Sequence, residues 1–108
     1  MTQKDVEQIV SSEIFSFRDA ALLDYTKSIM VSPIEKKLEY EWVTPSEIFM
    51  SWIACDMRER NVAVAYACGG FAETGYPWGL ILKDRNNSGP PNQWYKTLEH
   101  CIADYGPC

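Results

Sequence analysis

The segment of residues 62–68, VAVAYAC, constrains the fold more than any other, because it is apolar on both faces of an extended chain. Its larger side chains alternate with three alanines at the two-residue period of a β-strand. A strand with two apolar faces belongs in the interior of a sheet that is covered on both sides. The alanine face also allows a packed helix to approach closely. We therefore predict a central strand over these residues.

Two further segments predict strands that join this one. Residues 78–83, WGLILK, follow it closely enough that the two strands most simply pair as an antiparallel hairpin. Residues 37–43 predict a half-buried strand, because apolar and charged side chains alternate along it. We expect this third strand at an edge of the sheet, where charge protects it or a partner covers it. Its apolar face holds Leu38, Tyr40 and Trp42, and its charged face holds Lys37, Glu39 and Glu41.

The N-terminal segment predicts a helix over residues 4–29. It contains no proline or glycine and repeats apolar side chains at steps of three or four residues. Candidate breaks lie at Ser11–Ser12 and at residues 15–17. Pro33 ends the helical pattern, because the residue before a proline disfavours helical geometry.

Residues 44–61 form the clearest local helical signal. Thr44 is a good N-cap, Pro45 suits the first helical position, and Glu47 completes a capping box. A last helix is predicted over residues 91–105, before Gly106–Pro107. The apolar stripe of the middle helix is Ile48, Phe49, Trp52, Ile53 and Met57.

These elements predict the order α-β-α-β-β-α. The corresponding fold class is α+β in two layers: a small, about three-stranded, mainly antiparallel sheet with helices packed on it. A length of 108 residues indicates a single globular domain over residues 1–108.

The charged residues of the chain indicate which classes of partner it can bind. The chain has 15 acidic and 10 basic residues, a net charge of −5, and no cluster of lysine and arginine that could track phosphates. Nucleic-acid binding requires such a basic face, so we do not expect it. An acidic surface favours basic protein partners and disfavours anionic membranes.

The chain shows no pattern of secretion, membrane insertion or cofactor binding. The N-terminus lacks an apolar signal region, and the longest uncharged run is too short to span a bilayer. We therefore expect a cytoplasmic protein with reduced thiols. The four cysteines lack the spacing of a zinc site, and no cofactor or metal is predicted. We expect Cys55, Cys68 and Cys101 to be buried.

The glycine-rich segment CGGFAETGYPWG, residues 68–79, could be a phosphate cradle, an active-site loop or a contact surface. A phosphate cradle would need a lysine and a helix directly after the glycines, and a strand follows instead. A long hairpin loop explains the glycines but leaves Phe71 and Tyr76 unexplained. These aromatic side chains either fold back onto the protein or anchor a partner protein.

An enzymatic alternative uses Cys68 and His100, the only histidine, as a thiolate nucleophile and its base. The helical stripe of residues 98–105 places His100 on its flank, and no third orienting group is apparent. This alternative predicts a Cys68 thiol that reacts faster than an ordinary one.

The interpretation that we carry forward is a small acidic protein-binding module. It would most specifically be a bacterial inhibitor of the immunity-protein or antitoxin type that masks a basic site on another protein. A second alternative is a structural or oligomeric subunit that pairs through an open strand edge. In the binding model, charge comes from Glu39, Glu41 and Glu73, and apolar anchors come from Phe71 and Tyr76.

Overall fold

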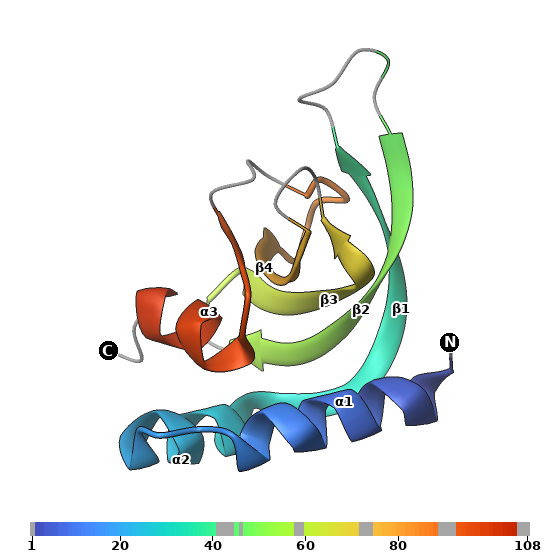
Figure 1. The fold of residues 1–108 in the computed structure, drawn as a ribbon. Helices are drawn as coiled ribbons and strands as arrows, with labels where there is room; N and C mark the ends of the chain where they lie inside the picture. Colours follow the sequence, from blue (N-terminus) through green and yellow to red (C-terminus); the bar gives the residue numbers. More distant parts are fainter. Residues whose placement is uncertain are drawn as a thin grey trace.

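The computed structural model describes residues 2–40, 45, 47–57, 60–71, 75–88 and 93–105, with the backbone alone described at Phe71. Within these residues the chain forms three helices and a five-stranded antiparallel sheet, which confirms the α+β class (Figure 1). The elements are α1 (Gln3–Phe15), α2 (Ala20–Ile29), β1 (Met30–Tyr40), β2 (Glu47–Met57), β3 (Val62–Phe71), β4 (Tyr76–Leu82), β5 (Trp94–Tyr95) and α3 (Leu98–Tyr105).

The strands lie in the order in which they occur along the chain, β1-β2-β3-β4-β5, and each pairs antiparallel with its neighbours. Strand β3 is central, as its two apolar faces predicted, and β1 is an edge strand. The predicted count of three strands is wrong, because β2 and the short β5 were both assigned to helices.

The predicted helix over residues 44–61 is wrong: residues 47–57 form β2, which pairs with β1 on one side and β3 on the other. The strand register shifts between Ile53 and Cys55. Such a bulge adds one residue and turns the following side chains onto the opposite face. Neighbouring apolar residues can therefore all be buried in a strand, and the resulting spacing imitates a helical stripe. Thr44 of the predicted capping box lies outside the described residues.

The N-terminal segment breaks into two helices at residues 16–19, which overlap the candidate break at residues 15–17. The Asp19 carboxylate begins α2 by accepting hydrogen bonds from the backbone N–H groups of Ala21 and Leu22, at 2.9 and 3.1 Å. Strand β1 then starts at Met30 and runs through Pro33, earlier than predicted. Pro33 is tolerated because the β1–β2 register is irregular between Met30 and Ile34.

The last helix is shorter than predicted. It begins at Leu98, after β5, and the Thr97 hydroxyl accepts a hydrogen bond from the His100 N–H at 3.1 Å. Two carboxylates connect this helix to the N-terminal pair. Glu13 accepts from the Leu98 N–H at 2.7 Å, and Glu99 accepts from the N–H groups of Arg18 and Asp19 at 2.9 Å each.

The larger core lies between the helices and one face of the sheet, here called the helix-side face. Figure 1 shows α1 and α2 lying along the base of the sheet and α3 beside them. Among the described residues no helix is long and apolar enough to cross a bilayer. The core includes Val6, Val10, Ile29, Trp52, Cys55, Met57, Val64, Trp78, Leu98, Cys101 and Ile102.

A second core fills the opposite face of the sheet, around Trp94. Residues of β1, β3, β4 and β5 meet there, and Figure 1 shows β1 and β2 curving past the shorter strands. The segment after β4 returns to the outer edge of β1: Lys36 Nζ donates to the Lys83 carbonyl at 3.1 Å. The curved sheet and the segment after β4 therefore cover the alanine face of β3, so this face is buried inside the protein. The buried members are Leu38, Ala63, Ala65, Ala67, Ile81 and Trp94.

Candidate functional site

Both long hairpins turn at the same end of the sheet, which we call the hairpin end. Strands β1 and β3 finish there, at Tyr40 and Phe71, and β2 and β4 begin there, at Glu47 and Tyr76. The antiparallel pairing thus brings Glu39, Phe71 and Tyr76 of the predicted binding set to one end of the sheet. The other two predicted residues, Glu41 and Glu73, lie outside the described residues.

Glu39 lies on edge strand β1 and is half-buried. Its N–H donates to the Asn86 carbonyl at 2.7 Å, and its carbonyl accepts from the Ser88 N–H at 3.0 Å. We expected this edge to be protected by charge or covered by a partner. At Glu39 the protein's own chain covers it, so a second chain could not extend the sheet at this residue.

An exposed apolar pair lies beside Glu39. Ile48 is 70% exposed and Met50 is 43% exposed, and they occupy alternate positions on the helix-side face of β2. Across the β1–β2 ladder Ile48 lies opposite Glu39, and Met50 lies opposite Lys37. We call these four residues the hairpin face. Figure 1 shows this part of β1 and β2 rising away from α1 and α2, which explains why no helix covers it.

Sequence reasoning missed Ile48 and Met50 as surface residues. It placed Ile48 in the buried stripe of a helix and gave Met50 no role. The signal that could have found them is the two-residue period of a strand, which puts both side chains on the same face.

The connection between β3 and β4 is shorter than the long loop that we predicted, because β3 continues to Phe71 and β4 begins at Tyr76. These two residues are paired across the ladder, and the Tyr76 side chain is 40% exposed. Gly69 and Gly70 have φ of +82° and +90°, and the β3–β4 register is irregular beside them. The two glycines therefore serve as a bulge that carries the ladder up to Phe71.

The structure does not join Cys68 to His100. Cys68 is exposed, contrary to prediction, because the helix-side core reaches along β3 only as far as Tyr66. The His100 ring packs edge-on against the Tyr95 ring, with centroids 5.1 Å apart. No hydrogen bond links the thiol and the imidazole among the described residues, so cysteine-dependent catalysis gains no geometric support and stays an untested alternative.

The other two described cysteines are buried, as predicted. Burial raises the pKa of Cys55 from its ordinary 9.0 to about 12, and burial also raises the pKa of Cys101. The contribution of the Cys55 thiol to stability is complete below pH 9 and is lost as pH rises towards 12. No group of three or more potential metal-ligating side chains occurs within the described part of the chain.

These environments predict distinct thiol reactivities. In a Cys108→Ser background, Ellman's reagent at pH 8 should label Cys68 within minutes, because that thiol is exposed. Cys55 and Cys101 should react only after denaturant is added. The variant Cys68→Ser should lose the rapid phase completely. A rapid phase that persists in this variant would mean that one of the two core thiols is accessible, contrary to the packing described above.

Comparison of the chain with protein-family models, with curated proteins and with solved structures found no match. The proposal below therefore rests on the residues of this chain alone.

Proposed function

We propose that this chain is a protein-binding module that contacts its partner through the hairpin face and Tyr76. The observation that carries the proposal is the exposed pair Ile48 and Met50, on an arm of the sheet that none of the three described helices covers (Figure 1). Scattered single apolar residues are normal on a surface, whereas adjacent ones on one face form a contiguous patch.

The composition of the patch suits a protein more than a small ligand. Protein interfaces combine an apolar centre with a polar rim, and methionine and tyrosine are enriched in them. Here Ile48 and Met50 would form the centre, and Lys37 and Glu39 the rim. The carboxylate of Glu39 belongs to the charged set predicted from the sequence.

The proposed partner is a protein with a basic surface. The net charge of −5 supports this choice, because long-range attraction increases the rate at which oppositely charged surfaces meet. In its specific form the proposal is an inhibitor of the immunity-protein or antitoxin type, which masks a basic site on its target. Glu41 and Glu73 remain part of the proposed charged set.

The test compares two matched surface variants in capture from a lysate of the source cells. Ile48→Thr/Met50→Thr removes the apolar centre and keeps β-forming residues in β2. Phe15→Ser removes a side chain that is 94% exposed at the end of α1, far along the chain from the hairpin face. The wild type and Phe15→Ser should retain the same basic protein, and the double variant should lose it.

With the captured protein purified, the double variant should bind it about 10- to 100-fold more weakly, as expected when interface anchors are truncated. Glu39→Gln should instead slow association, and the difference should disappear at high salt. Equal retention by all variants would place the contact surface elsewhere and overturn the proposal.

A further inference from the structure

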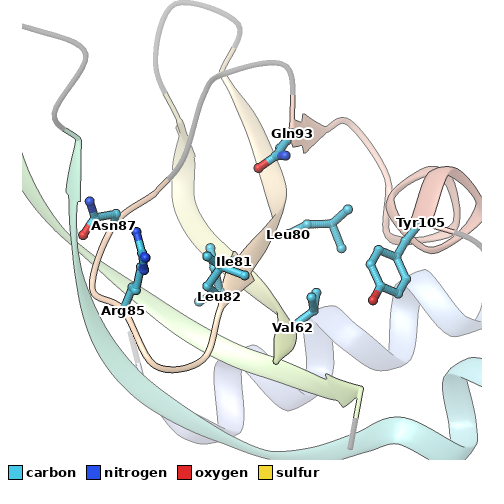
Figure 2. Close-up of a pocket in the computed structure, with 8 residues that line it drawn as sticks. All are labelled: Val62, Leu80, Ile81, Leu82, Arg85, Asn87, Gln93 and Tyr105. Atoms are coloured by element: carbon cyan, nitrogen blue, oxygen red, sulfur yellow. The ribbon is translucent and has the colours of Figure 1, made fainter. Parts of the chain in front are cut away.

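A partly enclosed cavity of about 340 Å³ lies beside the end of β4 and extends to Asn87, which bridges to Glu39 of the hairpin face (Figure 2). It lies where β5 leaves β4, because β5 pairs only with Trp78 and Gly79 and the last three residues of β4 continue past it. Its volume lies within the range of small-molecule sites, roughly 300 to 1,000 Å³. The cavity shares no residue with the hairpin face.

One side of the cavity is apolar. Val62 of β3, Leu80 of β4 and Tyr105 of α3 line it, and all three are half-buried against the helix-side core. Figure 2 shows these three side chains grouped together. The Arg60 guanidinium stands over the Tyr105 ring at 5.0 Å from its centroid, a distance at which the cation stabilises that position of the ring. This wall can accept a hydrocarbon or aromatic body.

The other side is polar and cationic. Arg85 and Asn87 lie together there, and the Gln93 amide borders the same cavity. The neighbouring charges are already engaged: Lys83 pairs with Asp56 at 2.8 Å, and Asp84 accepts from Asn61 at 2.7 Å. Within the described residues the Arg85 guanidinium has no carboxylate partner. Arg85 is exposed, so its guanidinium is open to an anion at the mouth of the cavity.

We propose that this cavity binds a small organic acid with an apolar body, such as a medium-chain fatty acid. The carboxylate binds Arg85, whose fork of N–H donors matches its two oxygens. The Asn87 amide donates a further hydrogen bond, and the hydrocarbon chain extends towards Val62, Leu80 and Tyr105 (Figure 2). Apolar burial supplies affinity, and the guanidinium supplies selectivity for an anion.

The probes are octanoate and its neutral analogue octanamide, titrated into the ¹⁵N-labelled full chain and followed by amide chemical shifts. Octanoate should shift the amides of residues 80–87, Gln93 and Tyr105, and it should bind about tenfold more tightly than octanamide, as expected for one charge-assisted interaction. Arg85→Gln should remove this preference, and Leu82→Ser, at an exposed lining residue, should weaken both ligands.

The charge-matched control is Arg18→Gln, which removes a cation from the loop before α2 and should leave both affinities unchanged. The proposal is overturned if octanoate shifts no amides near the cavity. It is equally overturned if octanoate and octanamide bind alike, or if Arg85→Gln and Arg18→Gln have the same effect. These outcomes are read from ligand binding with no variant of the hairpin face, so the two proposals are tested by different variants and different probes.

Discussion

Trp94→Ala is expected to lower the free energy of unfolding by about 3 to 5 kcal/mol, the range found when a large buried aromatic side chain is truncated. The indole is 2% exposed and lies at the centre of the second core. A Cβ atom added at Gly79 would come within 2.3 Å of the indole ring, so the ring rests directly on the β4 backbone. The indole N–H donates to the Ser88 carbonyl at 3.0 Å.

The measurement is urea denaturation followed by far-ultraviolet circular dichroism. Trp94→Phe is the control, because it keeps an aromatic ring in the core and removes mainly the hydrogen bond to Ser88. Its expected effect is smaller, about 1 to 2 kcal/mol. If Trp94→Ala unfolds at the wild-type urea concentration, the second core does not hold the curled sheet together.

Gly70→Ala is expected to lower the free energy of unfolding by about 3 kcal/mol or more, through two additive effects. The φ of +90° is unfavourable for any residue with a side chain and costs about 1 to 2 kcal/mol. The new Cβ would also lie 2.0 Å from the Gly75 carbonyl oxygen, a backbone atom that cannot move without distorting the hairpin.

Gly69→Ala is the matched control for this prediction. Gly69 also has a positive φ, +82°, but nothing lies within 4 Å of the added Cβ. Only the conformational term applies, so the expected loss is about 1 to 2 kcal/mol. Thermal denaturation of both variants separates the steric effect from the conformational one. Equal losses would contradict the close approach of Gly70 to Gly75.

The parts of the fold that could be predicted from the sequence are those with strong local patterns. Residues 62–68 are apolar on both faces, and only the centre of a sheet satisfies that requirement. The alternation around Glu39 predicted an edge strand, and β1 is one. The break between α1 and α2 overlaps the candidate break at residues 15–17, and the structure adds that Asp19 caps α2 there.

The secondary-structure predictions that were wrong concern segments whose conformation depends on pairing with distant parts of the chain. The bulge at Ile53 and Cys55 gives β2 the apolar spacing of a helix, and only its ladders with β1 and β3 show that it is extended. Trp94 was likewise assigned to a helix, the one predicted over residues 91–105. Its position in β5 depends on Gly79, which leaves room for the indole on the neighbouring strand.

The candidate sites also divide into residues that a local sequence pattern could indicate and residues that only the folded chain brings together. Tyr76 was singled out as an aromatic residue on a loop, and it is exposed where β4 begins. Ile48 and Met50 were missed because they were assigned to a helix. The cavity could not be predicted, because its walls come from β3, β4, the segment before β5 and α3, which only the folded chain brings together.

The most direct test of the central proposal is site-specific photo-cross-linking at the hairpin face. A benzophenone amino acid is placed at Met50 or, as the control, at Phe15, and each protein is irradiated in a lysate of the source cells. We expect one dominant adduct with a basic protein from position 50, reduced by Glu39→Gln at low salt, and none from position 15. No adduct at position 50, or the same adducts from both positions, would contradict the assignment of this face to protein binding.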